Sequence, residues 1–442
     1  MRQNFRSDFA RPIYIVDGLR TPWLKARGEP GAFSAADLAV QACRYLLARQ
    51  SFTADQLDEV VTGCVMASPD ETNISRVIAL RLGCGKAVPA YTVQRNCASG
   101  LQALDSAALD IACGRYDLVL AGGTEAMSQA PLLFNPGMTR FLARWNAAKT
   151  PIMRLRCLSQ FHWKYLVPVI ALLRGLTDPI VGLSMGQTAE IVSHRFGITR
   201  QQMDEWSLQS HQRSAIAQDK GVFTDEINAI YDGDNHYYSY DNGLRRDTSL
   251  EKLGILKPFF DKPFGLVTAG NSSQVTDGAA FLILASEKAV QRYQLPILAR
   301  IVAVNWAALD PSEMGLGPVH AVAGLLKKQE LAFSAIDYWE INEAFSGQVL
   351  ACLAAWQESH YCKTELGLSD ALGKLDPSIV NIDGGAIAMG HPVGASGARI
   401  VLHLAHVLRR KKARFGVATL CIGGGQGGAL LLENVDSTKG MG

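Results

Sequence analysis

The residues Asn96-Cys97-Ala98-Ser99-Gly100 join a strand-like run, which ends near Gln94, to a helical pattern. In that pattern four apolar side chains share one helix face: Leu101, Leu104, Ala108 and Ile111. A second apolar run at 118–121 follows and leads into Gly122-Gly123. Strand, helix and strand in this order predict a parallel strand pair with helical cover.

The same order of elements recurs late in the chain. Residues 379–382 read as a strand, and Gly394-Ala395-Ser396-Gly397 opens a second helical pattern. Its apolar face carries Ile400, Val401, Leu404 and Leu408. A strand pattern at 417–420 then leads into Gly423-Gly424-Gly425. The Ala-Ser-Gly triplet thus occupies the same place in both copies.

Two further pairs of segments extend this repeat upstream. Residues 13–16 resemble 301–304 as an opening strand, and residues 57–61 resemble 336–340 as a helix end that runs into a strand. Short apolar strands and Ala-Ser-Gly triplets recur by chance in α/β proteins, but three matched pieces in one order favour a duplication. We therefore predict an α/β protein built from two similar halves.

The residues between the two halves differ in composition. They contain an amphipathic helical pattern at 201–218 and a loop rich in Tyr, Asp, Asn and Gly at 231–243. We interpret this region as an inserted loop domain. The predicted boundaries are 1–127 for the first half (completed by about 262–290), 128–261 for the loop domain and 291–442 for the second half.

The overall composition excludes several classes of protein. The chain has 442 residues, 48% of them hydrophobic and 19% charged, which is enough apolar material for a large core and atypical of a disordered chain. A net charge of +2 argues against a general nucleic-acid binder. Nine cysteines without tight spacing indicate reduced thiols rather than a disulfide framework. These features predict a cytoplasmic protein.

The even charge hides a strongly basic segment. No acidic residue lies between Glu125 and Asp178, and seven basic ones do: Arg140, Arg144, Lys149, Arg154, Arg156, Lys164 and Arg174. Aromatic and aliphatic residues alternate with them. Three interpretations stay open: a membrane-surface or partner-docking element at 139–176, the lining of a substrate pocket with arginines near anionic groups of the ligand, or a solvated basic face.

Cys97 and His391 are the first candidates for catalysis. A thiol at a helix N-terminus faces free backbone N–H groups, which favour the thiolate and should lower its pKa. His391 precedes the matching helix of the second half, so packing of the two copies would bring it near Cys97, where a neutral imidazole can accept the thiol proton. The alternatives are a buried core thiol and a structural histidine.

Cys421, Asn342 and Glu343 follow predicted strands, where open α/β sheets expose functional groups. Glycines 423–428 after Cys421 do not open a helix, so they fit close substrate approach and a backbone oxyanion donor better than a dinucleotide site. Asn342 could hold a water or donate to a carbonyl, and Glu343 could orient its neighbours, unless both merely cap a loop. The Cys and His spacings match no zinc motif, so no metal is expected.

Together these motifs resemble the thiolase family over nearly the whole chain. The matching segments, in family order, are Asn96–Gly100, Ala121–Ser128, Thr268–Ser273, Asp277–Ala280, Asn342–Phe345, Gly390–Pro392 and Cys421–Gly425. The resemblance implies the thiolase fold, a duplicated five-layered α-β-α-β-α arrangement with an inserted loop domain.

The resemblance also implies a role for each matching residue. Cys97 would be the nucleophile that becomes acylated, His391 would activate it, and Cys421 would exchange the proton of the acetyl-CoA carbon. Asn342, through a water, would complete one oxyanion site with His391, while the backbone N–H groups of Cys97 and Gly423 would form the other. Ser273 matches a position that touches the pantetheine arm of CoA.

The implied reaction is cleavage of a 3-ketoacyl-CoA by CoA, as in fatty-acid β-oxidation, with CoA and acyl-CoA as substrates and no covalently bound cofactor. One alternative is a biosynthetic thiolase that condenses two acetyl-CoA molecules. Another is a non-catalytic, lipid-binding thiolase-like subunit. A decarboxylating ketoacyl synthase would usually carry His where Cys421 stands.

Details of the resemblance bear on partners and location. Many short-chain thiolases have His before the Met-Gly of the loop-domain helix, whereas this chain has Ser184. Segments 241–245 and 345–348 look more like the β-subunits of trifunctional complexes, although those usually have His at the position of Asn342. The family implies a homodimer or a dimer of dimers. An α-subunit with hydratase and dehydrogenase activity or a membrane surface would bind through 139–176, in the cytoplasm or, in a eukaryote, the mitochondrial matrix.

Overall fold

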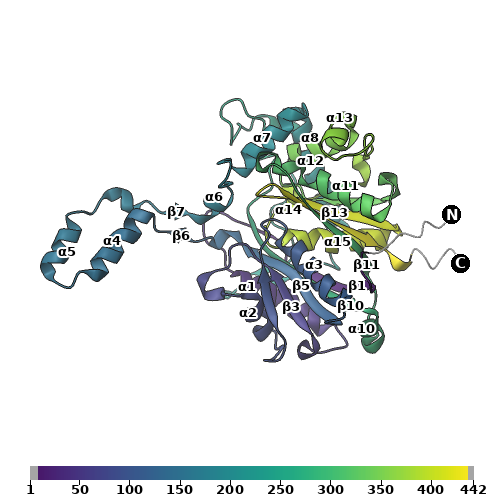
Figure 1. Ribbon diagram of the computed structural model, residues 1–442, viewed down its shortest axis with the longest axis horizontal. Coiled ribbons are helices and arrows are strands. Elements are labelled where there is room, and N and C mark those ends of the chain that lie inside the picture. Colours follow the sequence, from purple (N-terminus) through teal and green to yellow (C-terminus); the bar gives the residue numbers. More distant parts are fainter. Residues whose placement is uncertain (1–7, 437–442) are drawn as a thin grey trace.

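The computed structural model describes residues 8–436, so residues 1–7 and 437–442 of the two predicted halves lie outside it. Its centre is a ten-stranded sheet in which the strands of the two halves meet side by side (Figure 1). The first half contributes β1 (Ile13–Arg20), β2 (Leu24–Lys25), β3 (Glu59–Gly63), β4 (Ala90–Val93), β5 (Leu118–Ala126) and β10 (Thr276–Ser286). The second half contributes β11 (Ala299–Ala308), β12 (Tyr338–Ile341), β13 (Phe415–Ile422) and β14 (Gln426–Glu433).

The strand order shows the duplication directly. From the centre outward the first half runs β1, β10, β5, β3, β4, and the second runs β11, β14, β13, β12. β1 and β11 join the halves through antiparallel pairs such as Ile13 with Ile301. In both halves the pairing beyond the central strands turns parallel, between β5 and β3 and between β13 and β12. The predicted pair of similar halves is confirmed.

The helices form three layers, and the first and second halves of the sheet form the two layers between them. α3 (Ser99–Ala112) and α15 (Ser396–Lys411) pack against each other in the middle layer, within one hydrophobic cluster that both halves share. α1 (Ala35–Ala48) and α2 (Ile74–Arg81) cover the outer face of the first half over a second cluster. α11 (Gly317–Gln329) and α12 (Ser346–Gln357) cover the second half over a third cluster. The predicted α-β-α-β-α arrangement is therefore confirmed.

The repeated triplets lie where the two middle helices approach most closely. A Cβ atom added to Gly100 would lie 2.8 Å from the Gly394 carbonyl oxygen, and one added to Gly397 would lie 2.5 Å from the Leu101 backbone nitrogen. A side chain at either position would collide with backbone atoms of the other copy. Glycine in both triplets thus allows the beginnings of the two helices to meet.

One predicted strand is wrong. Residues 377–379 form a 3-10 turn, and within 379–382 only Val380 makes a β-bridge, to Trp339. Pro377 has no N–H to donate, and Asn381 adopts a left-handed backbone conformation with φ of 45°. The Asn381 side chain instead bonds both the N–H and the carbonyl of Ile341. A side chain therefore replaces the ladder that an apolar strand would have formed.

Part of the insertion packs on the two α/β halves, which together we call the body. The predicted helix at 201–218 is α8 (Arg200–Asp219), which follows α7 (Met185–Arg195). The predicted loop at 231–243 contains a short hairpin, β8 (Ile230–Tyr231) with β9 (Tyr237–Tyr238). The remaining short helices of the chain are α6 (Ala171–Gly175), α9 (Leu250–Gly254), α10 (Glu287–Tyr293), α13 (Ser359–Thr364) and α14 (Ala386–Met389).

A buried ionic network ties the insertion to both halves. Arg20 of β1 bonds Glu226 and Asp241 of the insertion, with nitrogen–oxygen distances of 3.0 and 2.7 Å. His403 of α15 lies 2.9 Å from Glu226 and 3.2 Å from Asp383. Glu226 therefore connects β1 to α15.

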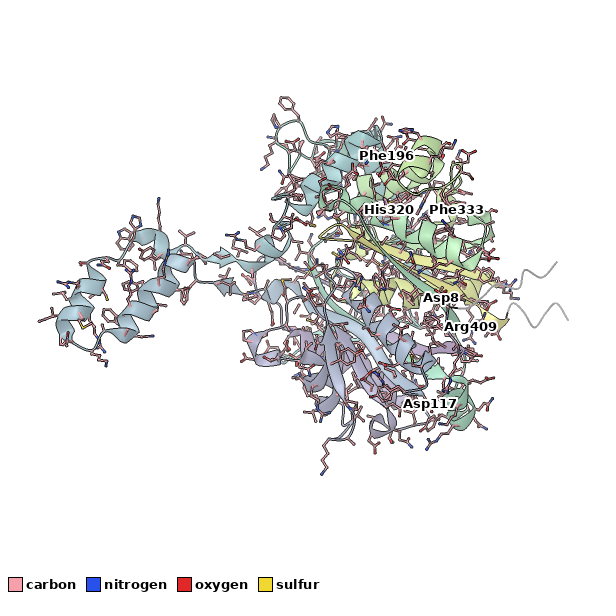
Figure 2. The ribbon with its side chains drawn as sticks, viewed as in Figure 1. Asp8, Asp117, Phe196, His320, Phe333 and Arg409 are labelled. Carbon is pink, nitrogen blue, oxygen red and sulfur yellow. The ribbon has the colours of Figure 1, made fainter. Side chains whose placement is uncertain are left out.

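The basic segment forms a separate helical lobe, residues 134–168. It consists of α4 (Pro136–Ala147), α5 (Pro151–Leu158) and a 3-10 turn, Trp163–Leu166. A two-stranded stalk, β6 (Leu132–Leu133) with β7 (Val169–Ile170), connects it to the body. The lobe projects far from the sheet, and its side chains point outward on several sides (Figures 1 and 2). It lies apart from the elements that carry Cys97. This does not fit the pocket-lining interpretation, which for a thiolase would mean an acyl-chain pocket with arginines near the CoA phosphates. None of the helices within residues 8–436 has the length and apolar character that crossing a membrane requires.

Candidate active site

Cys97 lies in the turn between β4 and α3, two residues before the helix begins at Ser99. The backbone N–H groups of Gly423 and of Cys97 itself point at its sulfur and favour the thiolate. Burial outweighs them and raises the pKa of the thiol above its ordinary value. The predicted lowering of this pKa is therefore wrong. Cys97 needs a base to become a nucleophile.

His391 is a suitable base. Its ring is buried, and burial, assisted by the charge of Arg399, lowers its pKa to about 4, so the imidazole is neutral at pH 7. Nδ1 lies 2.6 Å from the Ser396 hydroxyl, which in turn donates to the Pro392 carbonyl at 3.0 Å. This arrangement assigns the proton to Nδ1 and leaves the lone pair on Nε2. Nε2 then lies 3.5 Å from the Asn342 side-chain nitrogen.

Asn342 follows β12 and is fully buried. Its Oδ1 atom has no hydrogen-bond partner among residues 8–436. Buried polar groups are normally paired, so an oxygen without a partner beside His391 is where a bound water or a substrate group fits. The structure thus brings Asn342 and His391 together, as the motif predicts.

Glu343, the next residue, holds this region together. Its carboxylate accepts hydrogen bonds from four groups: Trp206 Nε1 at 3.1 Å, Ser210 Oγ at 2.7 Å, Asn381 Nδ2 at 3.0 Å and the Ile387 N–H at 3.2 Å. These donors come from α8, the turn after Val380, and α14. Glu343 therefore connects the insertion to the loop that precedes His391, in keeping with its predicted orienting role.

Cys421 lies on β13, one strand further into the sheet than Asn342. Burial raises the pKa of its thiol well above the ordinary value, and the neighbouring Cys97 adds to this effect. Cys97 is therefore close enough to affect the ionisation of Cys421. The surroundings of Cys421 are apolar: Ala189, Val267, Met314, Ala344 and Phe345, with Met185 and Phe260 against them.

Gly423 begins the tight turn between β13 and β14. Its N–H faces Cys97, and its carbonyl accepts a 2.8 Å hydrogen bond from the Asn96 side chain. A Cβ added to Gly423 would lie 3.3 Å from the Met185 sulfur. The strand β14 follows as predicted, and no helix begins at the glycines. Gly423 thus presents a backbone donor to the Cys97 sulfur.

Ser273 lies between the other motifs. Its N–H donates to the Ala344 carbonyl at 2.9 Å, and the adjacent Gln274 carbonyl accepts the His391 N–H at 3.0 Å. The Ser273 side chain is half-buried. Residues 273–274 therefore bridge the Asn342 and His391 loops.

Two residues of this site carry contacts that sequence reasoning missed. Ser396, a member of the second Ala-Ser-Gly triplet, fixes the tautomer of His391 through its contact with Nδ1. Glu125, in the motif at 121–128, is fully buried and accepts the N–H groups of Val65, Met66 and Gly394 at 2.9–3.0 Å. Glu125 thereby ties the His391 turn to the first half. The motifs included both residues, but only their long-range contacts show what each one holds.

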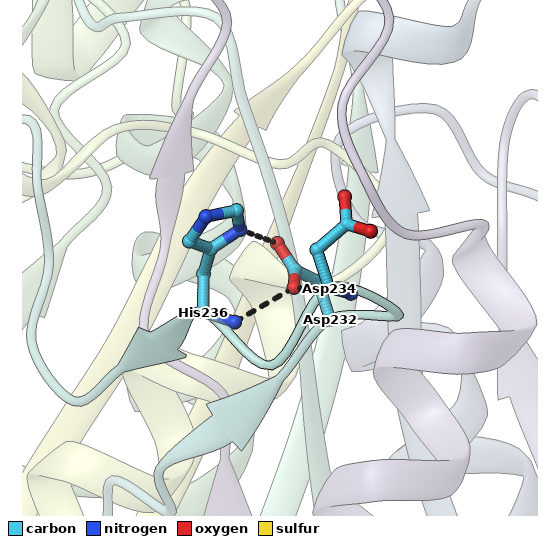
Figure 3. Close-up of side chains that lie close together, drawn as sticks. All are labelled: Asp232, Asp234 and His236. Atoms are coloured by element: carbon cyan, nitrogen blue, oxygen red, sulfur yellow. Dashed lines mark hydrogen bonds and ion pairs between the residues drawn. The ribbon is translucent and has the colours of Figure 1, made fainter.

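One cluster in the described part of the chain has the spacing of metal ligands: Asp232, Asp234 and His236, on the β8–β9 hairpin (Figure 3). Hydrogen bonds account for it. The Asp232 carboxylate accepts the N–H groups of Asp234 and His236, each at 2.9 Å, and contacts the His236 ring at 2.9 Å. The hairpin turn thus uses the carboxylate that an ion would need.

Comparison with known proteins agrees with this geometry. Residues 13–288 match the family model for the thiolase N-terminal domain, and residues 295–434 match that for the thiolase C-terminal domain. The β-ketoadipyl-CoA thiolase of Pseudomonas aeruginosa is 39% identical over 96% of this chain and 100% of that protein. The 3-ketoacyl-CoA thiolase of Yersinia pestis is 34% identical over 95% of this chain and 96% of that protein.

The fold has close counterparts among solved structures. Human mitochondrial 3-ketoacyl-CoA thiolase superimposes with a TM-score of 0.83 at 36% identity, over 97% of this chain and 100% of that one. Its complex with CoA gives a TM-score of 0.82. The acetyl-CoA acetyltransferase of Bacillus anthracis gives 0.83 at 35% identity. In motifs, fold and length, the chain belongs to the thiolase family, whose members are acyltransferases that use CoA as a substrate.

Proposed function

We propose that this thiolase degrades 3-ketoacyl-CoA substrates with apolar acyl chains, as in fatty-acid β-oxidation. The observation that supports this substrate class is the apolar cluster around Cys421, in which Met185, Met314, Phe260 and Phe345 surround the thiol. Such side chains favour an aliphatic chain over a polar one.

The proposed reaction begins at Cys97. The His391 Nε2 atom takes the thiol proton, and the sulfur attacks the 3-keto carbon of the substrate. The bond between carbons 2 and 3 then breaks, and carbon 2 takes a proton from Cys421 to leave as acetyl-CoA. The products of this half-reaction are an acylated Cys97, a protonated His391 and a Cys421 thiolate.

The second half-reaction restores both thiols. The Cys421 thiolate takes the proton of free CoA, whose sulfur attacks the acyl group, and Cys97 leaves and regains its proton from His391. Asn342, through a water, and His391 would stabilise one oxyanion. The N–H groups of Cys97 and Gly423 would stabilise the other. Ser273 would contact the pantetheine arm of CoA.

A second candidate substrate follows from the relatives. Those named β-ketoadipyl-CoA thiolase are 38–39% identical, against 34–36% for those named 3-ketoacyl-CoA thiolase, so a dicarboxylic acyl group is the second candidate. A distal carboxylate needs a cation, however. The side chains packed around Cys421 form an apolar cluster. These surroundings favour the apolar chain.

Thiolysis rates on a series of 3-ketoacyl-CoA substrates of increasing chain length, and on 3-oxoadipyl-CoA, test the proposal. We expect kcat/KM to rise with aliphatic length beyond acetoacetyl-CoA and to be lowest for the dicarboxylate. Preference for 3-oxoadipyl-CoA would contradict the β-oxidation proposal. Efficient condensation of acetyl-CoA, with little activity on longer chains, would instead support the biosynthetic alternative.

We also propose that the chain forms a homodimer or a dimer of dimers in the cytoplasm, as the family resemblance suggests. The helical lobe would serve as an attachment element, either for an α-subunit with hydratase and dehydrogenase activity or for a membrane surface. Its separation from the body on a stalk supports a role outside the chemistry. Sedimentation velocity would test the oligomeric state.

A further inference from the structure

We propose that the helical lobe binds an anionic lipid bilayer by lying in its surface. This deepens the attachment role proposed above and commits it to one partner. The first observation is exposure. Of the 24 large hydrophobic side chains that are exposed within residues 8–436, eight lie in the lobe itself, residues 134–168, which makes up less than a tenth of the chain, and four more lie in its stalk and in α6. An apolar surface of this density on a soluble body indicates an interaction site.

The lobe already has a small core, so these exposed groups are not needed for its folding. Phe141 of α4 packs against Phe161 at a ring distance of 5.2 Å, and Tyr165 lies 5.9 Å from Phe161. Met138 and Ala148 are buried with them. The remaining apolar side chains point away from this core and are available to a partner.

α5 has the pattern of a helix that lies in a membrane surface. Successive residues of an α-helix turn by about 100°, which places Ile152, Leu155 and Leu158 together on one side. Arg154 and Arg156 then flank this stripe, one on each edge. Cys157 falls on the opposite side, where it lines the cleft toward Phe141 of α4. Ile152 is 78% exposed and Leu155 69%, so the stripe is bare in the isolated chain.

Charge favours an anionic lipid surface over other partners. The segment between Glu125 and Asp178 carries seven cations and no anion, and Trp163, 78% exposed, lies beside Lys164. Arginine and lysine beside an apolar stripe can contact lipid phosphates while their stems stay among the acyl chains. Tryptophan prefers the same depth of the bilayer. Two lobes of like charge would repel, which disfavours direct contact between lobes of two copies.

Geometry fits a flat surface. Figure 1 shows α5 in the part of the lobe that is farthest from the body, beyond α4. A helix at this place can lie in a bilayer surface while the body stays outside it. With 8 residues, α5 is about 12 Å long, well short of the roughly 30 Å of a hydrocarbon core, so the lobe would enter the interface and not cross it.

Co-sedimentation of the full-length protein with vesicles tests the proposal. We expect binding to vesicles of phosphatidylcholine mixed with phosphatidylglycerol, weaker binding to pure phosphatidylcholine, and weakening with salt. The Arg154→Glu/Arg156→Glu variant should bind at least about 25-fold more weakly, because each cation changes partitioning by about fivefold. The Ile152→Ser/Leu155→Ser variant should also lose binding to the anionic vesicles.

Two matched controls lie on the body. Lys327→Glu/Lys328→Glu makes the same charge change on the exposed last turn of α11, and Ile216→Ser removes an exposed aliphatic side chain from α8. Both should bind vesicles as the wild type does. Every variant should retain wild-type thiolysis rates without vesicles, which shows that it is folded. Loss of thiolysis in all proteins, wild type included, would count against the proposed function and leave the lipid result intact.

Three results would overturn the proposal: no wild-type binding to anionic vesicles, equal binding by the Arg154/Arg156 variant, or equal weakening by the body controls. If the lobe variants instead change the mass of the protein in sedimentation equilibrium without any vesicle binding, the lobe is an interface between copies of this chain, and the lipid proposal is wrong.

Discussion

The His403→Gln substitution removes a buried positive charge from between the carboxylates of Glu226 and Asp383. His403 is almost fully buried on α15, and its two ring nitrogens lie 2.9 and 3.2 Å from these groups. Burial alone would lower the pKa of the imidazole. The carboxylates, Glu226 foremost, raise it to about 10 instead, so His403 is an imidazolium at neutral pH.

The magnitude follows from the difference between the folded and unfolded pKa values. A rise from 6.5 to about 10 corresponds to roughly 5 kcal/mol of stabilisation, since one pKa unit is 1.36 kcal/mol. Because the folded pKa lies above the unfolded one, this contribution is complete below pH 6.5, falls with rising pH and is lost as the pH passes 10. The variant should therefore be less stable than the wild type by about 5 kcal/mol at pH 6, about 3 at pH 8 and about 1 at pH 9.5.

Urea unfolding of both proteins at these pH values measures the differences. His406→Gln is the matched control. It lies one turn along the same helix, and burial lowers the pKa of its imidazole. Its loss should therefore leave the difference from wild type constant between pH 8 and 9.5 and change it by less than about 1 kcal/mol at pH 6, in the direction opposite to His403→Gln. A constant gap between wild type and His403→Gln from pH 6 to 9.5 would refute the reasoning, because it would mean that His403 is neutral in the fold.

Three other substitutions address the site and the helix crossing. Cys97→Ser should abolish thiolysis and the acyl adduct seen by mass spectrometry after mixing with substrate, and retained turnover would contradict the nucleophile assignment. Asn342→Ala removes an oxyanion group and should lower kcat by about 10²–10³-fold with little change in KM, so a change confined to KM would argue against that role. Gly397→Ala places a methyl group 2.5 Å from the Leu101 nitrogen and should lower the free energy of unfolding by about 1–3 kcal/mol, whereas an unchanged urea midpoint would show that the helices can separate without cost.

Much of the fold could be predicted from the order of short motifs. The matched strands at 13–16 and 301–304 lie side by side in the sheet. The helices that begin at the two Ala-Ser-Gly triplets pack against each other in the middle helical layer. The strand predicted at 379–382 failed for a local reason. An asparagine side chain can imitate backbone pairing, and an apolar pattern does not reveal this.

The motifs predict which residues belong to the candidate site better than they predict the electrostatics of that site. The motifs name Cys97, His391, Asn342 and Cys421, and the structure places Asn342 beside His391 and Cys97 near Cys421. The pKa of Cys97 was predicted with the wrong sign, because the position of a thiol before a helix is visible in sequence and the extent of its burial is not. The contacts of Glu125 and Ser396 join residues far apart in the chain, so only the folded structure could show them. The stalk that carries the lobe was likewise invisible, since its strands are two residues each.

The crossing of α3 and α15 bears on how the two copies could diverge. Cys97 and His391, the proposed nucleophile and base, occupy related places before the two helices, yet they are different residues. Gly100, Gly397 and their neighbour Gly123 had no such freedom: a Cβ on Gly123 would lie 1.9 Å from the Gly394 carbonyl oxygen. A methyl group gained by either copy must be accommodated by the other copy's backbone. After duplication, residues beside the contact between the two helices could therefore change separately in each half. A change at the contact itself had to be accommodated by both halves.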